Sequence, residues 1–478
     1  MKMNKENYTL LCDFYELTMA NGYFLEKMDN TITYFDVFFR DLPKGSGYAI
    51  ACGLESIIDY INNLKFDDSD IEFLRSKNIF DEQFLEYLRN FKFTGDIYAC
   101  EEGSIIFPHE PILTVRAPAI EAQFVETYLL LVLNHQSLIA TKTSRIVYAS
   151  DGRPVMEFGS RRAQGESAAI LGARSAYIAG ASGTACTISD KYYGSPALGT
   201  MAHSWVQMFN TEYEAFDAYC KHYPTNAVLL IDTYNVLNQG LPNAIKAFKA
   251  NNITKGGVRI DSGDIAYLSK KCRKILDQNG LKDIKIVASN SLDENIISEL
   301  LLQGACIDSF GVGERLITAK DDPVFGCVYK LSAVEKNGEI IPKIKVSENV
   351  AKITNPGFKK TYRIYDKETN KAMADIICLH DEEIDETKPL EIFDEHMIWK
   401  RKVITNYYIK PLLTLIFKDG KQVYKKPSIE EIRTNCQKQL DSLWDEVKRL
   451  VNPQTYYVDL SQKLYDLKYN MINKVIKG

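Results

Sequence analysis

The sequence predicts an α/β protein built on an irregular parallel α/β barrel of the TIM type, with an N-terminal α/β domain and a C-terminal strand-plus-helix extension. From residue 154 to about 318, short apolar runs alternate with helical stretches, as in successive βα units. These runs end about one βα unit apart, which is the spacing of a parallel barrel. The candidate strands are PVMEF, YIAGAS, PALGT, AVLLIDT, GGVRID, IKIVAS and IDSFGVG.

Changes in pattern divide the chain into three regions. Its 478 residues exceed the about 250–300 at which single cores stop growing. Residues 1–150 combine helical segments such as FDEQFLEYLRNF with the strand-rich GDIYACEEGSIIFPHEPILTVRAP, which predicts an N-terminal α/β domain. Residues 151–330 form the predicted barrel. Residues 331–478 return to strands and then helices, and we expect this extension to pack on the other two regions.

Composition excludes several classes of protein. The net charge is −5 and the pI is near 5.9, so no basic face indicates nucleic-acid binding. The longest apolar run, TYLLLVL, is shorter than the ~18 residues that a membrane span needs, and the N-terminal sequence lacks the apolar core of a signal peptide. The ten cysteines are scattered, which predicts reduced thiols and a cytoplasmic location.

Two local patterns predict how helices begin and pack within the barrel region. The segment SWVQMFNTEYEAFDAYC has apolar residues at helical spacing, so one face should cover the sheet. These residues are Val206, Phe209, Tyr213, Phe216 and Tyr219. The string SNSLDE fits a capping box formed by Ser291 and Glu294.

Polar residues and glycines follow every candidate strand. In a parallel barrel these positions lie around the C-terminal face, where active sites of this architecture are found. Polar residues often end strands simply because loops are exposed to solvent, which explains any one such position. It explains less well why arginines, aspartates, a histidine and glycine turns follow seven candidate strands in succession. The residues are Glu157, Arg161, Ser182, Thr184, Thr200, His203, Asp232, Arg259, Asp261, Ser289, Asn290, Gly311 and Gly313.

Two of these strings suit anion binding. EFGSRRAQG places two adjacent arginines, Arg161 and Arg162, after a glycine turn, which suits phosphate or carboxylate, although a solvated surface pair fits the string too. IDSFGVGERLIT has Gly311 and Gly313 beyond a strand, where backbone N–H groups can approach an anion. A plain tight turn explains a lone Gly-x-Gly equally well.

The remaining polar groups suit metal binding or acid–base chemistry. Asp232, Asp261 and Asp264 could hold Mg²⁺, ribose hydroxyls or a developing cation, or could simply cap helices. His203, between a strand and a helix, could be a base, a phosphoryl acceptor or a packed side chain. The remaining histidines show no metal-ligand spacing, so structural roles are expected for them.

Strings from about residue 8 to residue 335 together resemble the nicotinate phosphoribosyltransferase family. They are YTLLCDFYELTMANGYF, FDVFFRDLPKGSGYAIACGLE, EGSIIFPHEPILTVRAP, LLLVLNHQSLIATKTSR, EFGSRRAQG, GTMAHSWVQMF, GVRIDSGD and FGCVYKL, in the expected order. The resemblance implies a type II phosphoribosyltransferase that forms nicotinate mononucleotide from nicotinate and 5-phosphoribosyl 1-pyrophosphate in NAD salvage. It also implies ATP hydrolysis through a phosphohistidine, Mg²⁺, and a homodimer with shared active sites.

The matching strings imply a role for each candidate residue. His203 corresponds to the phosphorylated histidine, while Asp232 and Asp261 fall where related enzymes place carboxylates near ribose and Mg²⁺. Tyr15 of the neighbouring subunit and Phe158 correspond to the residues that sandwich the pyridine ring. The residues matched to nicotinate are Thr200 and Arg259, and those matched to the sugar phosphate are Arg161, Ser289, Asn290, Gly311 and Gly313. The carboxylates that bind the metal stay unassigned.

The sequence departs from the family at Glu314, where relatives often carry threonine. An acidic side chain repels a phosphate unless it turns away or pairs, for instance with Arg315. The tail has only Cys378 and Cys436 after residue 330, so no zinc site is expected. Nicotinamide and quinolinate phosphoribosyltransferases share the barrel architecture, so these two activities are the alternative enzyme functions. A catalytically silent ligand-binding relative is the non-enzyme alternative. Retention of His203 with its neighbouring carboxylates and arginine argues against the latter.

Overall fold

The structure is a computed structural model that describes residues 7–349 and 352–477. The chain divides into two compact units. The parallel-sheet unit comprises Ile139–Pro323, and the antiparallel-sheet unit comprises the described parts of Lys2–Leu138 and Val324–Gly478. Helix α6 (Glu126–Ala149) runs from one unit into the other. The division of the sequence into three domains at about residues 150 and 330 stays a prediction.

The parallel-sheet unit is built on a six-stranded sheet in which every neighbouring pair is parallel. The strand order is β7-β6-β11-β10-β9-β8. The strands are β6 (Val155–Glu157), β7 (Gly183–Thr184), β8 (Val228–Leu230), β9 (Gly257–Ile260), β10 (Lys285–Ser289) and β11 (Ser309–Val312). Most of their residues are buried, as expected for strands covered on both faces.

Helical segments connect these strands, in the alternation predicted from the sequence. They are η1 (Ser160–Arg162), α7 (Glu166–Ile178), α8 (Thr187–Tyr193), α9 (His203–Gln207), α10 (Glu212–His222), the π-helical turn η2 (Val236–Gly240), α11 (Leu241–Ala250), α12 (Ile265–Gln278), α13 (Glu294–Leu302) and α14 (Glu314–Ile317). The prediction of an α/β region with a parallel sheet is confirmed.

The predicted barrel is not confirmed, because within the described residues the sheet stays open between β7 and β8. Only Tyr177 and Ile178 of YIAGAS lie in α7, and Ala179 caps the end of that helix. Gly180 has a φ of 113°, so the chain turns here and forms no strand. PALGT contributes only a single bridge between Thr184 and Ala197. Pro196 has no N–H to donate and Gly199 favours no extended strand, so this segment is poorly suited to continue a ladder. The other five candidate strands form β6, β8, β9, β10 and β11.

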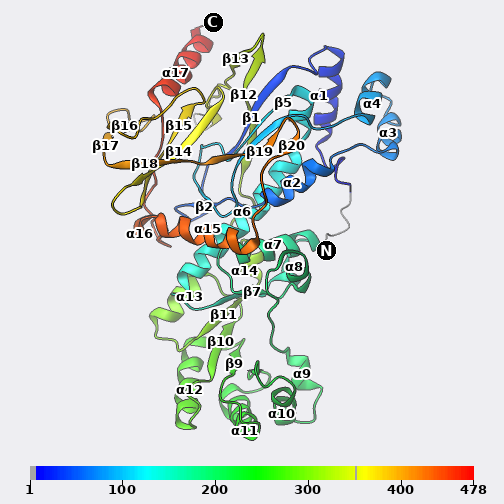
Figure 1. Ribbon diagram of the computed structural model, residues 1–478. Helices are drawn as coiled ribbons and strands as arrows, with labels where there is room; N and C mark the ends of the chain where they lie inside the picture. Colours follow the sequence, from blue (N-terminus) through cyan, green and yellow to red (C-terminus); the bar gives the residue numbers. More distant parts are fainter. Residues whose placement is uncertain (1–6, 350–351, 478) are drawn as a thin grey trace. The chain divides into compact units, whose positions relative to one another are not determined.

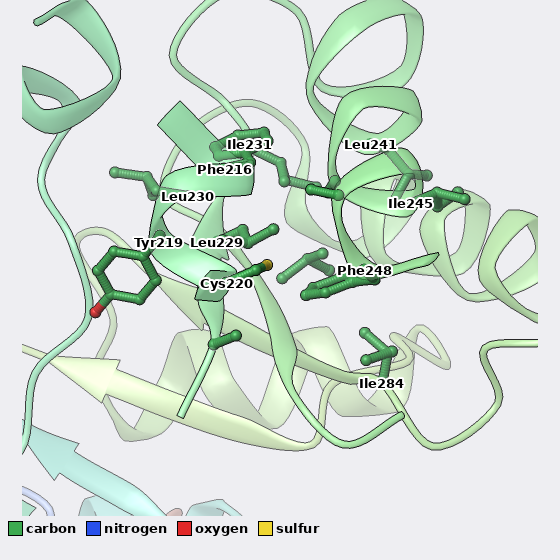
Figure 2. Packing of buried hydrophobic residues seen from close by; sticks show 14 of the residues in the cluster. Phe216, Tyr219, Cys220, Leu229, Leu230, Ile231, Leu241, Ile245, Phe248 and Ile284 are labelled. Atoms are coloured by element: carbon green, nitrogen blue, oxygen red, sulfur yellow. The ribbon is translucent and has the colours of Figure 1, made fainter. Parts of the chain in front are cut away.

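Figure 2 shows part of the apolar core of this unit, which combines residues of α10 and α11 with residues of the strands. Phe216 and Phe248 are fully buried there, beside Leu229 of β8. The predicted apolar face between residues 206 and 219 does pack on this core, with Val206, Phe216 and Tyr219 buried and its other members partly buried. It is divided into two helices, because Thr211 and Glu214 form a capping box that begins α10.

The predicted capping box at Ser291 and Glu294 is wrong. Asp293 is the N-cap of α13, and its carboxylate accepts a hydrogen bond from the Ile296 N–H at 2.9 Å. Ser291 has a φ of 50° and lies in the preceding loop. Asp is as good an N-cap as Ser, so the pattern alone could not decide which residue begins the helix.

The antiparallel-sheet unit is built mainly on a seven-stranded sheet in the order β13-β12-β1-β5-β3-β19-β20. A four-stranded sheet has the order β18-β14-β15-β21, and β16-β17 and β2-β4 form two-stranded sheets (Figure 1). The strands are β1 (Ile32–Phe39), β2 (Ala49–Ile50), β3 (Asp96–Cys100), β4 (Ile105–Ile106), β5 (Leu113–Pro118), β12 (Cys327–Lys336), β13 (Glu339–Pro342), β14 (Lys359–Asp366), β15 (Ala372–Leu379), β16 (Leu390–Phe393), β17 (Arg401–Ile404), β18 (Tyr407–Pro411), β19 (Leu413–Lys418), β20 (Lys421–Gln422) and β21 (Val458–Leu460).

Helices complete this unit. They are α1 (Phe14–Leu25), α2 (Leu54–Asn63), α3 (Asp68–Arg75), α4 (Glu82–Arg89), α5 (Ala119–Phe124), α15 (Ile429–Ser442), α16 (Asp445–Lys448) and α17 (Gln462–Lys477). The predicted helix in FDEQFLEYLRNF and the strands in GDIYACEEGSIIFPHEPILTVRAP are confirmed as α4 and as β3, β4 and β5. Among the described helices, none has the length and apolar character to cross a bilayer.

Candidate active site

The carboxyl ends of the parallel strands bring the candidate residues to one edge of the sheet. Ser289 ends β10 and is paired in register with Gly311 of β11. Asp261 directly follows β9, and Asp232 comes two residues after β8. Because all these strands run in the same direction, their polar end residues meet at the same edge, as the sequence predicted.

Arg259 is the best-connected side chain at this edge. Its Nε donates to the Ser289 hydroxyl at 2.8 Å, its Nη1 to the Thr200 hydroxyl at 3.1 Å and its Nη2 to the Asp261 carboxylate at 3.0 Å. The Ser289 hydroxyl also donates to the same Asp261 oxygen. These contacts hold the guanidinium in a fixed orientation, with only 15% of the side chain exposed.

Asp232 is a buried carboxylate whose two oxygens have different surroundings. Its Oδ2 accepts from the backbone N–H of Asp261 at 3.1 Å and from the Ser262 hydroxyl at 2.6 Å. Its Oδ1 is buried and has no hydrogen-bond partner among the described residues. The side chain is 1% exposed. A buried carboxylate oxygen without a donor is costly, so this oxygen is a candidate ligand for a cation.

His203, the first residue of α9, lies beside this carboxylate. Its Nδ1 lies 3.1 Å from the Thr233 hydroxyl, and its Nε2 lies 4.0 Å from Asp232 Oδ1. The imidazole is 42% exposed, so a ligand can reach it. The structure thus places a solvent-accessible imidazole next to a buried carboxylate.

Phe158 supplies an aromatic surface to the same group of side chains. The Arg259 guanidinium carbon lies 5.5 Å from the centre of its ring. A Cβ at Gly311 would lie 2.7 Å from the ring atom Cδ2, so only glycine leaves room for the ring here. The backbone N–H of Phe158 donates to the Val312 carbonyl at 2.7 Å, which fixes the turn after β6 against β11.

Glu157 organises this turn from inside the protein. Its fully buried carboxylate accepts from the Thr184 hydroxyl at 2.5 Å and from the backbone N–H of Gly159. Burial raises the pKa of Glu157. The carboxylate therefore connects the loop after β6 with the end of β7.

Other predicted residues make fewer contacts. Arg161 lies in η1, exposed, and none of the described residues forms an ion pair with it. Asn290 is exposed, has a φ of 90°, and accepts a hydrogen bond from Ser291 at 3.1 Å. Gly313 precedes α14, and a Cβ there would lie 3.2 Å from the Phe158 carbonyl oxygen. Tyr15 belongs to the antiparallel-sheet unit, on α1, and is 44% exposed.

The structure also answers questions that the sequence left open. Asp264 caps α12 by accepting from the Tyr267 N–H at 2.9 Å, so the structural interpretation holds for this aspartate. Glu314 is exposed, and Arg315 pairs with Asp293 instead of with Glu314. Sequence reasoning missed Ser262 and Thr233 as partners of Asp232 and His203. Their adjacency to Asp261 and Asp232 in the strings RIDSGD and LLIDTYN was the only available signal.

Comparison with known proteins gives a consistent result along the chain. The family model described as Nicotinate phosphoribosyltransferase (NAPRTase) family matches residues 154–379. The models for the N-terminal and C-terminal domains of nicotinate phosphoribosyltransferase match residues 10–134 and 358–468.

Individual relatives match over nearly their full length. The chain is 43% identical over 472 residues to the nicotinate phosphoribosyltransferase of Bacillus subtilis (strain 168), covering 98% of this chain and 96% of that protein. It is 32% identical to the Dictyostelium discoideum enzyme of the same name, covering 97% of this chain and 88% of that protein. The crystal structure of human nicotinic acid phosphoribosyltransferase is similar, with a TM-score of 0.83 at 27% identity, covering 97% of this chain and 100% of that one.

Proposed function

Because the chain belongs to the nicotinate phosphoribosyltransferase family, we propose that its candidate active site joins nicotinate to 5-phosphoribosyl 1-pyrophosphate and releases pyrophosphate. The product is nicotinate mononucleotide, and the reaction belongs to NAD salvage. The observation that carries this proposal is the Arg259 guanidinium, which is held by Ser289, Thr200 and Asp261 next to the Phe158 ring.

Nicotinate is a flat ring that carries a carboxylate, and both parts have partners in this proposal. The aromatic face of Phe158 stacks on the pyridine. Arg259 and the Thr200 hydroxyl bind the carboxylate with charge-assisted and neutral hydrogen bonds. An amide in place of the carboxylate loses the charge, which favours nicotinate over nicotinamide.

The sugar phosphate binds the loops that follow β10 and β11. Ser289 ends β10 and Asn290 follows it, while Gly311 lies near the end of β11 and Gly313 follows that strand. Backbone N–H groups and small side chains at these strand ends can surround an anion. Arg161 is exposed and has no carboxylate partner among the described residues, so its charge is available to a phosphate.

Asp232 and Asp261 act at the ribose. Cleavage of the bond between ribose C1 and pyrophosphate leaves positive charge on the sugar ring, and the pyridine nitrogen attacks C1 from the opposite face. A buried carboxylate at this point stabilises the developing cation. The unpartnered Oδ1 of Asp232 and the neighbouring Asp261 also fit Mg²⁺, a hard cation that prefers oxygen ligands. When bound, Mg²⁺ neutralises charge on the departing pyrophosphate.

His203 couples the reaction to ATP. Its imidazole is exposed enough to attack the terminal phosphorus of ATP, forming an N–P bond as the bond to ADP breaks. Asp232, 4.0 Å from Nε2, stabilises the positive charge that the ring gains in this step. The phosphohistidine then loses its phosphoryl group to water, so ATP hydrolysis drives the transfer forward.

The remaining parts of the proposal concern assembly and location. The protein acts as a homodimer with shared active sites, in which Tyr15 of the neighbouring subunit stacks on the pyridine opposite Phe158. The 44% exposure of the Tyr15 side chain leaves its ring free to meet such a ligand. We expect the enzyme to work in the cytoplasm.

The test is a product assay with nicotinate, nicotinamide and quinolinate, each with 5-phosphoribosyl 1-pyrophosphate and each with and without ATP. Nicotinate mononucleotide should form fastest, and ATP should stimulate its formation. A preference for either other base would assign one of the alternative transferase activities. Absence of product from all three bases, with a folded protein, would indicate a catalytically silent relative.

A further inference from the structure

A salt bridge joins the loops that follow β10 and β11. The Arg315 guanidinium, on α14, binds the Asp293 carboxylate through Nη1 and Oδ2. The two side chains are 26% and 8% exposed. Because β10 and β11 are neighbouring parallel strands, the pair links the carboxyl ends of two strands across the edge of the sheet where the candidate residues lie.

Asp293 has a second partner that fixes its position. Its Oδ1 caps α13 by accepting from the Ile296 N–H at 2.9 Å, so one carboxylate connects the first turn of α13 with α14. Although burial opposes it, the hydrogen bonds from Ile296 and Arg315 and the charge of Arg315 lower the pKa of Asp293. The carboxylate is therefore ionised at neutral pH.

The neighbouring residue is fixed from the other side. Glu294 is buried, and its carboxylate binds Lys142 at 2.8 Å and Arg145 at 3.2 Å, both on α6. The start of α13 is thus held by three cationic side chains, of which Arg315 alone comes from α14, the helix that follows β11. A change at Arg315 should release the loop after β11 without releasing α13.

The loop after β10 needs such support. Asn290 and Ser291 have φ angles of 90° and 50°, a conformation that side-chain-bearing residues rarely adopt. Consecutive residues of this kind persist only when surrounding contacts determine them. Leu292, buried to 1% exposure, and Asp293 provide those contacts on the C-terminal side of the loop.

We propose that Arg315 and Asp293 are a positioning pair that sets the spacing of the loops after β10 and β11 and thereby the affinity for the sugar phosphate. This inference rests on the proposed function, in which Ser289, Asn290, Gly311 and Gly313 bind that phosphate. Neither member of the pair needs to touch the substrate. The pair acts because it fixes the two backbones between which the anion binds.

The test compares Arg315→Met, Asp293→Asn and the double variant in steady-state assays. Asn remains a good N-cap, so Asp293→Asn removes the charge and keeps the start of α13. Each single variant should raise the KM for 5-phosphoribosyl 1-pyrophosphate about tenfold, within the range of coupled pairs, and change kcat and the KM for nicotinate less than about twofold. The double variant should equal either single variant, and Arg315→Lys should restore part of the affinity.

Arg273 and Asp277 provide a matched control. They form an Arg–Asp pair at 2.8 Å with side chains 20% and 43% exposed, near the end of α12. Arg273 also donates to the Ile284 carbonyl, directly before β10, at the opposite edge of the sheet from Ser289. Arg273→Met should therefore leave the KM for 5-phosphoribosyl 1-pyrophosphate within about twofold of wild type.

Three results would overturn the inference. If Arg315→Met raises this KM and Asp293→Asn does not, Arg315 contacts the phosphate directly. If the single effects add in the double variant, the residues do not act as a pair. If kcat and both KM values worsen together with the thermal midpoint, the pair is only structural. A folded wild-type protein that forms no product would instead overturn the proposed function, and this inference with it.

Discussion

Replacing Arg259 with methionine should remove the preference for nicotinate over nicotinamide. In the proposed function, the guanidinium recognises the carboxylate of the pyridine. Methionine is unbranched and fills a similar volume, so it removes the charge and the donors while it keeps the side-chain stem. The substitution therefore tests recognition more directly than truncation to alanine would.

The size of the effect follows from the contacts of Arg259. Its donors bind Ser289 at 2.8 Å, Thr200 at 3.1 Å and Asp261 at 3.0 Å, so the free side chain is already oriented and little entropy is lost when the ligand binds. A hydrogen bond to a charged group contributes about 1.5–3 kcal/mol. Loss of this bond should lower kcat/KM for nicotinate about 10- to 150-fold relative to nicotinamide. Both bases should also lose kcat, because Asp261 loses its cation.

The assay measures initial rates with each base at saturating 5-phosphoribosyl 1-pyrophosphate, for wild type, Arg259→Met and Arg259→Lys. Lysine keeps the charge but lacks the planar guanidinium. The ratio of kcat/KM for nicotinate to kcat/KM for nicotinamide in Arg259→Lys should therefore lie between those of wild type and Arg259→Met. Circular dichroism and the thermal midpoint check that each variant folds. A ratio of kcat/KM values in Arg259→Met equal to that of wild type would refute the assignment of Arg259 to the carboxylate.

Three further predictions address ATP, assembly and pH. His203→Ala should keep the fold and some ATP-independent transfer, but lose ATPase activity and acid-labile label from γ-labelled ATP; full labelling would assign phosphorylation to another residue. Mixing Tyr15→Ala chains with Asp261→Ala chains should restore activity in heterodimers, and no recovery in heterodimers shown to form would contradict a shared site. Burial raises the pKa of Glu16 from 4.5 to about 8, so the folded protein favours the protonated carboxyl group. The resulting contribution to the free energy of unfolding is complete below pH about 4.5 and is lost as the pH rises to about 8. Across this window, titration of Glu16 lowers the free energy of unfolding by up to about 1.4 kcal/mol per pH unit. Glu16→Gln removes this titration, so its thermal midpoint should fall less with pH than that of wild type. The same pH profile in both proteins would rule out this titration.

The sequence predicted which residues gather at the carboxyl edge of the parallel sheet more accurately than it predicted the shape of that sheet. Asp232 and Asp261 follow apolar runs that are recognisable as strands, while Arg259 lies within such a run and Ser289 ends one. The common direction of the parallel strands then brings these four residues together. Their hydrogen-bond pattern could not be predicted. The contact between Arg259 and Thr200 joins residues 59 positions apart, and only the packed structure determines that distance.

The errors arose where local patterns allow two conformations. YIAGAS is apolar enough for a strand, but only Tyr177 and Ile178 continue α7, and the chain then turns at Gly180, whose φ is 113°. SNSLDE contains several residues that favour the N-cap position, and in the structure Asp293 caps α13 while its carboxylate also binds Arg315, 22 residues later. Such a distant partner leaves no periodicity in the sequence, so the choice of cap could not be read from the string.

Glu314 is the one residue that suggested a lost activity, and its surroundings weaken that suggestion. The side chain is exposed at the first position of α14, where a negative charge also suits the helix dipole. In bulk water, even two unit charges about 4 Å apart repel each other by only about 1 kcal/mol, and physiological salt screens them further. Repulsion of this size changes phosphate affinity about fivefold at most. An acid at this position is therefore compatible with binding of the sugar phosphate, provided that Arg315 stays with Asp293 and Glu314 stays in water.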